Sequence, residues 1–395
     1  MDIKEIRELD KKFIINTYGE RPLALVRGEG VRVWDAEGKE YLDLFSGIGV
    51  NLLGYGHPKV VAAIREQAEK LIHVSNLYYT EPQVKLARLL SENSFGGKCF
   101  FSNSGAEANE AAIKLARKYA KREKTEDRGQ NERHEIITAK GSFHGRTLAT
   151  LSATGQTKYQ KGFEPLPVGF RYVPFNDIEA IKQAVNDKSC AIMLEPIQGE
   201  GGDHIASGEY LTALRKLSDE HGLLLIFDEV QCGLGRTGKL FAYQHSGVKP
   251  DIMTLAKPLG GGLPLGAMLA GEEVAAAFQP GNHASTFGGN PVACAAGVAV
   301  METLLEENLM QKAEETGNYL LQKLRELQQK YSFIVDVRGR GLMSGMELSF
   351  AGKDIARKCL ERGLLINCTA ETFIRFLPPL IITRKDIDEG MAILD

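Results

Sequence analysis

Two acidic residues end a strongly apolar segment in the middle of the chain. Residues 223–230 read LLLIFDEV, so Asp228 and Glu229 directly follow five apolar residues. An acid at the carboxyl end of a buried parallel strand points into the crevice where open α/β sheets bind ligands. The same residue could instead cap the next element of structure. Asp228 is therefore a candidate that needs support from other residues.

Lys257 is the second candidate, 29 residues after Asp228 in the segment TLAKPLGGGLPLG. It follows a short apolar run and precedes Pro258 and three glycines, a setting that neither a helix nor a solvated surface explains. A glycine-rich turn lets the backbone approach a bound group closely, and burial would lower the pKa of the amine, as Schiff-base chemistry requires. Most lysines are solvated, so one lysine alone does not establish this chemistry.

Two further segments offer binding groups. In SNSGAEANEAAIKLARK a strand ends near Ser102 and a helix begins at once, so free N–H groups and the helix dipole would favour an anion such as phosphate. An ordinary N-cap by Ser104 would look the same. In GSFHGRT, Phe143 could stack on a planar ring and Arg146 could hold a carboxylate. His144 fits a structural hydrogen bond better than catalysis.

A glycine pattern points to a different enzyme class. Gly233, Gly235 and Gly238 spell GxGxxG, the fingerprint of an NAD-dependent dehydrogenase. The pattern lies deep in the chain and begins four residues after Glu229, and no acidic residue follows about twenty positions on, as the fingerprint requires. We therefore disfavour this alternative.

The composition excludes several classes of protein. The 395 residues carry 48 Lys and Arg against 51 Asp and Glu, a net charge of -3, which is no footprint for a polyanion. The six cysteines show no CxxC pair and no Cys/His cluster at zinc-ligand spacing, so no metal site is predicted. The start has no secretory signal and no stretch reaches membrane-span length. We expect a soluble cytoplasmic protein that binds neither nucleic acid nor a membrane.

Strands and helices alternate through the central part of the chain. Apolar runs predict strands at residues 99–101, 135–139, 190–194, 223–227 and 266–270. Helical spacing predicts intervening helices at residues 109–124, 178–185 and 210–221. Strands that are apolar throughout and alternate with helices indicate an α/β fold with a mostly parallel sheet covered on both faces.

The two ends of the chain predict a smaller α+β domain. Strands are expected at residues 25–35, 41–45, 333–337, 342–348 and 373–377. Helices are expected at residues 291–331 and 353–362, whereas the helices expected at 58–71 and 81–93 and the polar surface loop at 121–134 belong to the large domain. We expect residues 1–57 to form the N-terminal part of the small domain and residues 58–290 the large domain. Residues 291–395 would supply a linking helix and the C-terminal part of the small domain.

Taken in order, these segments resemble the class III aminotransferases, the ornithine- and acetylornithine-type members of the fold type I enzymes that use pyridoxal 5′-phosphate (PLP). The resemblance covers nearly the whole chain. It also includes the segments NTYGERPLALVRGEGVRVWD, LDLFSGIGVNLLGYGHPKV, EPIQGEGG, STFGGNPVACAAG and FIRFLPPL. Several motifs at the expected separations are far more specific than any one alone. The resemblance implies a large PLP-binding α/β domain and a small domain from both chain ends.

The resemblance also implies roles for individual residues. Lys257 would hold PLP covalently and Asp228 would pair with its ring nitrogen, so these two are the predicted catalytic residues. Phe143 would stack on the ring, and Gln231 would lie near its phenolic oxygen. The remaining predicted cofactor positions are Ser104, Gly105, Ala106, Glu229, Val230 and Thr286. Thr286 would come from the second subunit, which implies a homodimer with shared sites.

Five positions match substrate-binding residues of the family. Arg146 matches the arginine that binds the carboxylate remote from the reacting amine, and Arg375 matches the one that binds the α-carboxylate of glutamate and 2-oxoglutarate. Glu200 matches the acid that pairs with Arg375 when the other amino donor is bound. Ser285 and Tyr18 match further substrate contacts.

Within the family, residues 47–60, 73–83 and 154–165 resemble the acetylornithine group more than the ornithine or GABA groups. This implies transfer of the δ-amino group of N2-acetyl-L-ornithine to 2-oxoglutarate, in arginine biosynthesis, with ping-pong kinetics. Ornithine, succinylornithine and N-succinyldiaminopimelate remain alternative substrates. A catalytically silent PLP-binding or scaffold protein is the alternative from another class, and the presence of Lys257, Asp228 and Arg375 argues against it.

Overall fold

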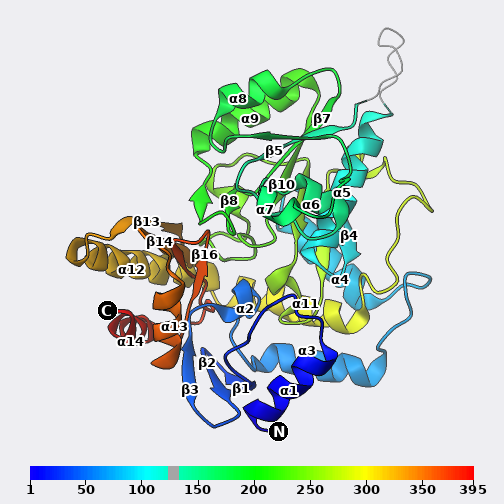
Figure 1. The fold of residues 1–395 in the computed structure, drawn as a ribbon. Helices are drawn as coiled ribbons and strands as arrows, with labels where there is room; N and C mark the ends of the chain where they lie inside the picture. Colours follow the sequence, from blue (N-terminus) through cyan, green and yellow to red (C-terminus); the bar gives the residue numbers. More distant parts are fainter. Residues whose placement is uncertain (123–132) are drawn as a thin grey trace.

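A seven-stranded sheet forms the centre of the computed structural model, which describes residues 1–122 and 133–395 (Figure 1). In spatial order the strands are β4 (Lys98–Ser102), β12 (Gly266–Ala270), β11 (Ile252–Leu255), β10 (Leu224–Asp228), β7 (Ser189–Leu194), β5 (Glu135–Ala139) and β6 (Phe170–Val173). β12 runs antiparallel to both of its neighbours, whereas the other neighbouring strands are parallel. The prediction of an α/β fold with a mostly parallel sheet is therefore confirmed.

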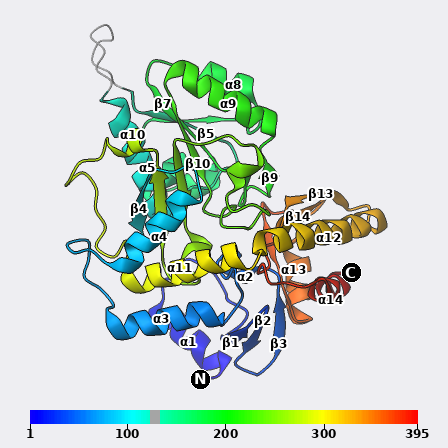
Figure 2. The same cartoon turned by 180° about the vertical axis from the view of Figure 1, so that it is seen from behind.

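Helices cover the sheet, and its inner strands are buried along their whole length, as expected for strands covered on both faces. Of the helices around the sheet, α4 (Glu81–Glu92), α5 (Gly105–Ala120), α8 (Ile178–Ala184) and α9 (Gly208–His221) pack directly on its strands. The others are α3 (Pro58–Lys70), α6 (Leu148–Ala153), α7 (Thr157–Gln160), α10 (Glu272–Ala275) and α11 (Pro291–Glu306). The mostly buried α11 packs against α3 and α4 (Figure 2). The apolar sequence of α11 thus marks a buried helix.

The single helical stretch predicted over residues 291–331 is divided in two. α11 ends at Glu306, and α12 (Leu309–Lys330) begins after a short break. Asn308 in this break has a φ of 53°, in the left-handed region. A continuous α-helix requires right-handed dihedrals at every residue. The helix is therefore interrupted here, before the C-terminal segments.

Segments from both chain ends form two small sheets beside the central one (Figures 1 and 2). The first sheet has the order β1 (Leu25–Glu29), β2 (Arg32–Asp35), β3 (Glu40–Asp43) and β15 (Leu364–Leu365). The second has the order β13 (Ile334–Arg340), β14 (Met343–Leu348), β17 (Phe373–Phe376) and β16 (Asn367–Thr369). β15 pairs in parallel with β3, so the first sheet needs strands from both ends of the chain.

The remaining elements are short or peripheral. They are α1 (Ile3–Phe13), α2 (Ser46–Gly49), the hairpin of β8 (Ile197–Gln198) and β9 (His204–Ile205), the 3₁₀ helices η1 (Ala242–His245) and η2 (Lys257–Gly260), α13 (Lys353–Glu361) and α14 (Arg384–Leu394). Residues 233–238, which carry the glycine pattern, form turns that do not open a helix, so the pattern lacks the setting of a dinucleotide site. Of the surface loop predicted at 121–134, residues 123–132 lie outside the described residues.

Within residues 1–122 and 133–395, no helix is long and apolar enough to cross a membrane. In the same two ranges, no group of three or more His, Cys, Asp or Glu is placed to hold a metal ion. All six cysteines are free thiols.

Candidate active site

The loops that follow the central strands meet at one edge of the sheet. Asp228 is the last residue of β10, Glu195 follows β7 by one residue, and Lys257 follows β11 by two. Because β7, β10 and β11 are parallel, these three residues share the carboxyl edge, where open α/β sheets bind ligands. The start of α5 adjoins them, since α5 follows β4 directly.

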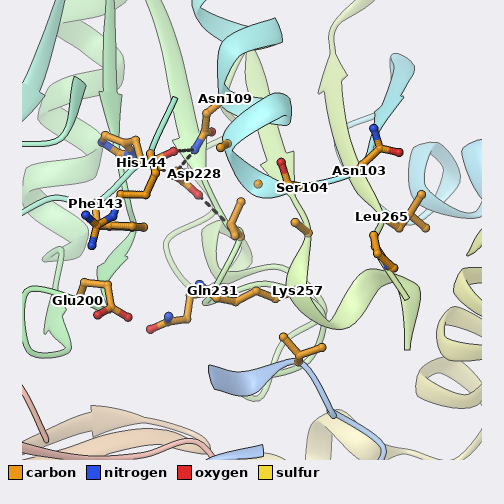
Figure 3. Close-up of a pocket in the computed structure, with 18 of the residues that line it drawn as sticks. Asn103, Ser104, Asn109, Phe143, His144, Glu200, Asp228, Gln231, Lys257 and Leu265 are labelled. Atoms are coloured by element: carbon orange, nitrogen blue, oxygen red, sulfur yellow. Dashed lines mark hydrogen bonds and ion pairs between the residues drawn. The ribbon is translucent and has the colours of Figure 1, made fainter. Parts of the chain in front are cut away.

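A cavity of about 430 Å³ opens at this edge (Figure 3). Many of the predicted site residues line it, namely Ser104, Gly105, Ala106, Phe143, Arg146, Glu200, Asp228, Val230, Gln231 and Lys257. Its volume falls within the usual range for small-molecule sites, about 300–1,000 Å³. Residues far apart in the sequence are thus brought together around a space that can hold a cofactor and a substrate.

Lys257 begins η2 with a φ of 41°, in the left-handed region. Residues with a Cβ rarely adopt this conformation, which persists where the surrounding structure imposes it. Burial lowers the pKa of the Lys257 amine; the nearby charge of Glu200 opposes this shift and that of Arg375 reinforces it. A lowered pKa increases the fraction of neutral amine, which is the form that acts as a nucleophile or base.

Asp228 is almost completely buried and accepts three hydrogen bonds. Its Oδ2 accepts from Asn109 Nδ2 at 2.7 Å and from His144 Nδ1 at 2.8 Å, and its Oδ1 accepts from the Val230 N–H at 3.1 Å. These donors offset the cost of removing a carboxylate from water. Because the carboxylate is the acceptor, the proton lies on Nδ1 of His144, which makes the kind of structural hydrogen bond that the sequence favoured.

Glu195 and Phe143 form one wall of the cavity. Glu195 Oε2 accepts from the Phe143 N–H at 2.9 Å, and Oε1 accepts from the Gly199 N–H at 3.3 Å. Burial, with the neighbouring charge of Asp228, raises the pKa of Glu195 well above its ordinary value. The Phe143 ring lies edge-on to Tyr159, with 5.6 Å between the centroids. Glu195 thereby anchors the loop that presents an aromatic side chain to the cavity.

The first turn of α5 forms another wall. Ser104 caps the helix by accepting from the Glu107 N–H at 3.2 Å. The N–H groups of Gly105 and Ala106 have no helical acceptors, as in the first turn of any α-helix. A Cβ on Gly105 would lie 2.7 Å from Val230 Cγ1, so glycine allows the helix to start this close to the end of β10. Helix N-termini of this kind bind phosphate groups.

Arg375 and Glu200 form an ion pair beside the cavity. Nη1 of Arg375 donates to Glu200 Oε1 at 2.8 Å and to Gln231 Oε1 at 3.1 Å, and Nη2 donates to Asn367 Oδ1 at 3.0 Å. Burial alone would raise the pKa of Glu200, but the charges of Arg375 and Lys257 hold it below its ordinary value. The Arg375 side chain is 2% exposed and meets the cavity through Glu200 and Gln231, which line it.

Arg146 is held differently. Its guanidinium lies over the ring of Tyr159 at 4.1 Å from the centroid and near the ring of Phe143 at 5.5 Å. Cation–π contacts of this kind orient an arginine without neutralising its charge. Within the part of the chain that the structure describes, Arg146 forms no ion pair. The cavity therefore has one arginine paired with an acid and one that is available to an anion.

Glu229 is the one residue of the DEVQ segment that does not line the cavity. Its oxygens accept from the N–H groups of Ala242 at 2.6 Å and Tyr243 at 2.8 Å, which begin η1. Burial raises the pKa of Glu229 to about 7. In this chain the side chain of Glu229 thus contacts η1, and its predicted contact with the cofactor stays a prediction.

Three other predicted residues lie outside the cavity lining of this single chain. Tyr18 is 81% exposed, and Thr286 is also exposed. Ser285 is nearer, because its Oγ accepts from Asn103 Nδ2 at 3.3 Å and Asn103 lines the cavity. These three positions would contribute to a site only through a neighbouring residue or a second subunit.

Comparison with known proteins identifies the family of this site. The model of the aminotransferase class-III family matches residues 14–395. The chain belongs to the class-III aminotransferases. The acetylornithine aminotransferase of Caldanaerobacter subterraneus subsp. tengcongensis is 57% identical over 387 residues, which cover 98% of this chain and 97% of that protein. The acetylornithine aminotransferase of Methanocaldococcus jannaschii is 56% identical over 388 residues, which cover 98% and 96%.

A solved structure agrees with this class-III assignment. The ornithine aminotransferase from Toxoplasma gondii superposes with a TM-score of 0.94 at 34% identity, covering 100% of this chain and 93% of that one, and it is described with PLP in partial occupancy at its active site. As a class-III aminotransferase, this protein uses PLP. Its cavity combines free N–H groups for a phosphate, a carboxylate for a ring nitrogen, an aromatic face and an amine for an aldehyde carbon. This set of groups fits PLP.

Among the residues of this class-III site that sequence reasoning missed are two polar side chains, Asn109 and Glu195. Glu195 ends the apolar run of β7, so it carried the same signal that pointed to Asp228. Asn109 stands four residues after Gly105 in α5, hence on the same side of the helix as the first turn. A polar side chain at that spacing from the anion-binding turn was the available signal.

Borohydride should label Lys257 and no other lysine. Hydride would reduce the double bond between Lys257 Nζ and the cofactor carbon to a stable amine. The lowered pKa of Lys257 favours this lysine over solvated ones, because only a neutral amine forms such a bond. Peptide mapping of the PLP-loaded protein after reduction identifies the lysine that carries the label. A label on another lysine, or none with PLP present, would overturn the role of Lys257.

Proposed function

We propose that this chain transfers the δ-amino group of N2-acetyl-L-ornithine to 2-oxoglutarate, giving N-acetyl-L-glutamate 5-semialdehyde and L-glutamate, a step of arginine biosynthesis. The observation that carries the proposal is the pairing of Arg375 with Glu200 while Arg146 stays unpaired. Relatives at 56–57% identity, named acetylornithine aminotransferases, support this substrate over ornithine. Ornithine, succinylornithine and N-succinyldiaminopimelate remain the alternatives within the family.

The two substrates present their carboxylates differently. Acetylornithine reacts through its δ-amine, so its single carboxylate lies far from the reacting carbon. Glutamate reacts through its α-amine, so it presents one carboxylate beside the reacting carbon and another far from it. Arg146 suits the remote carboxylate in both cases, because a guanidinium fork binds carboxylates in a bidentate manner. Arg375 is needed only for glutamate and 2-oxoglutarate, and Glu200 neutralises it for the other donor.

The other residues of the cavity have separate roles in binding the cofactor and in proton transfer. When bound, PLP supplies an electron sink for the negative charge left on a carbon that has lost a proton. The first turn of α5 would hold the phosphate, Phe143 would support the ring face, and Asp228 would hold a proton on the ring nitrogen. Lys257 Nζ would take a proton from the carbon that bears the reacting amine and would give that proton to the cofactor. General acid–base catalysis of this kind contributes about 10²- to 10⁴-fold.

Initial rates across a panel of amino donors test the proposed substrate. The panel is acetylornithine, ornithine, succinylornithine and N-succinyldiaminopimelate, each with 2-oxoglutarate as acceptor. We expect acetylornithine to have the highest kcat/KM. A higher kcat/KM for any other donor would reassign the substrate within the family, and no transfer from any donor would favour the silent PLP-binding alternative.

We also propose a homodimer with shared sites. Thr286 is exposed in the single chain, and it adjoins an exposed apolar surface formed by Leu77, Tyr78, Tyr79 and Phe287. Asn76 Nδ2 donates to the carbonyls of Ser285 and Gly288, which joins the two segments of that surface. Exposed apolar patches of this kind mark interaction sites. A second copy of the chain would cover the patch and bring Thr286 to the cofactor phosphate of its partner.

Mixing two inactive variants tests this arrangement. Lys257→Ala removes the covalent lysine, and Thr286→Ala removes the proposed cross-subunit contact. If Thr286 serves the partner's site, a mixed dimer contains one site with both residues intact, and activity should return to a measurable fraction of wild type. Assays after subunit exchange, verified by native mass spectrometry, give the result. No recovery despite verified exchange would mean that Thr286 serves its own chain.

A further inference from the structure

Asn109 is a buried side chain that lines the active-site cavity and donates hydrogen bonds to two other residues of its lining, Asp228 and His144. It lies in the second turn of α5 and is 1% exposed. Its Nδ2 donates to Asp228 Oδ2 at 2.7 Å and to the backbone carbonyl of His144 at 2.7 Å. Its Oδ1 accepts from the Thr254 hydroxyl at 2.6 Å. Both N–H donors and the oxygen of the amide are therefore engaged, by partners on three different segments.

Thr254 holds this amide from the opposite side. It is fully buried on β11, where it is the register partner of Asp228 on β10. Its hydroxyl supplies the donor that Asn109 Oδ1 needs, since a buried carbonyl oxygen without a partner is costly. A rotated amide would instead turn its oxygen toward the Asp228 carboxylate and the His144 carbonyl, which are both acceptors. The contacts thus select one orientation of Asn109.

Asn109, Asp228 and His144 form a closed set of contacts. Asn109 bonds to Asp228 and to the His144 carbonyl, and the His144 ring bonds to Asp228. His144 directly follows Phe143, so the loop that carries the aromatic wall is tied to the same carboxylate. A ring nitrogen is approached in the plane of the ring, whereas a stacking side chain lies over its face. The two groups must therefore keep a fixed mutual orientation to act on one ring.

We propose that Asn109, oriented by Thr254, is a positioning residue that fixes the carboxylate of Asp228 and the loop of Phe143 relative to each other and to the phosphate-binding turn of α5. This inference rests on the roles proposed above for Asp228 and Phe143. Asn109 belongs to α5 itself. The helix that would bind the cofactor phosphate thus also fixes the positions of the Asp228 carboxylate and the Phe143 loop. The competing view is that Asn109 only satisfies polar groups in the core and contributes stability alone.

Four variants separate these views. Asn109→Ala removes all three contacts, and Thr254→Val removes only the hydroxyl at nearly constant shape. Thr254→Ser keeps the hydroxyl and removes only the methyl group. Thr303→Val is the matched control, because Thr303 is also fully buried and donates to a backbone carbonyl, that of Ala299 in α11, and does not line the cavity. For each variant we would measure PLP affinity of the apo-enzyme, visible circular dichroism of bound PLP, kcat and KM, and the Tm of the apo-enzyme.

If Asn109 positions Asp228 and Phe143, Asn109→Ala should lower kcat by about 10- to 100-fold and weaken PLP binding about tenfold, the scale of a lost hydrogen bond to a charged group. KM should change little, and the circular dichroism of bound PLP should change because the ring is held differently. Thr254→Val should change the same quantities in the same direction by about 3- to 10-fold, as for a neutral hydrogen bond. Thr254→Ser and Thr303→Val should behave like wild type in all of them.

The double variant Asn109→Ala/Thr254→Val tests whether Thr254 acts through Asn109. Its kcat should equal that of Asn109→Ala, because a partner that acts only through a missing side chain has no further effect. If the kcat losses of the two single substitutions multiply in the double variant, the inference is overturned. A Thr254→Ser variant as impaired as Thr254→Val would also overturn it. A loss of Tm alone in Asn109→Ala, with kcat, PLP affinity and circular dichroism unchanged, would also overturn it.

The same measurements on Asp228→Asn separate this inference from the proposed function. If Asp228→Asn is impaired and Asn109→Ala is not, only the positioning role of Asn109 fails. If Asp228→Asn behaves like wild type, the proposed role of Asp228 fails, and with it the basis of the inference. The affinity and dichroism measurements need no substrate, so they hold whichever amino donor the enzyme uses.

Discussion

Replacing Asp228 with asparagine should lower kcat by at least about 10- to 100-fold, because a hydrogen bond to a charged group contributes about 1.5–3 kcal/mol. The substitution keeps the shape of the side chain and removes its negative charge, so a proton on the ring nitrogen of the cofactor is no longer stabilised. The one oxygen of asparagine can still accept from His144 Nδ1 and Asn109 Nδ2, so the fold should persist although the hydrogen bond from the Val230 N–H is lost. Steady-state kcat and thermal unfolding of the same preparations measure the two effects.

Asp251→Asn provides the matched control for this change. Asp251 accepts from the Leu225 N–H at 2.7 Å and pairs with Arg215, at the opposite edge of the same sheet from the cavity. The same isosteric loss of charge there should leave kcat within about threefold of wild type, although it removes an ion pair. A kcat for Asp228→Asn within the same range as this control would contradict the catalytic role of Asp228.

Replacing Arg375 should affect one half-reaction far more than the other. Arg375→Ala should slow the half-reaction with glutamate or 2-oxoglutarate by about 100-fold or more, since it removes a bidentate partner for a carboxylate. The half-reaction with acetylornithine should change much less, because Arg375 is paired with Glu200 in that state. Single-turnover rates, measured separately with each substrate, give the two effects.

Glu200→Ala should produce the opposite pattern. Without its acid partner Arg375 stays available, so the glutamate half-reaction should be retained or favoured, and reaction of ornithine through its α-amine should compete. Arg146→Ala is the reference, because both substrates have a remote carboxylate and both half-reactions should then slow together. Equal losses on both sides in Glu200→Ala would show that Glu200 only orders the turn between β8 and β9, and that the pair is no gate.

Sequence patterns predicted those site residues whose position follows from the neighbouring residues in the chain. Asp228 and Lys257 were found because each follows an apolar run, and a parallel sheet brings the ends of such runs to one edge. Asn109 was missed because its role depends on Thr254 and His144, which lie 145 and 35 residues away. A helical pattern shows which side of α5 is buried, but not which polar group the buried amide meets.

The break between α11 and α12 shows a signal that the sequence prediction passed over. Neither proline nor glycine occurs at residues 306–309, but Asn308 is of a type that tolerates the left-handed region and often follows the end of a helix. The break at Asn308 separates two packing environments, since α11 lies against α3 and α4 whereas α12 contacts β13 and α14. The contributions of Tyr18 and Thr286 remain predictions, because a single chain leaves both side chains exposed.

The pairing of β15 with β3 has a consequence for how the chain folds during its synthesis. During synthesis β3 leaves the ribosome more than three hundred residues before β15, and until β15 arrives the hydrogen-bonding edge of β3 is open. Unpaired strand edges invite wrong pairing and aggregation, and contacts this distant in sequence form slowly. Arg375 lies beyond β15, so the substrate site is also completed last. A nascent chain can therefore fold its central sheet and the first turn of α5 well before it can distinguish its two substrates.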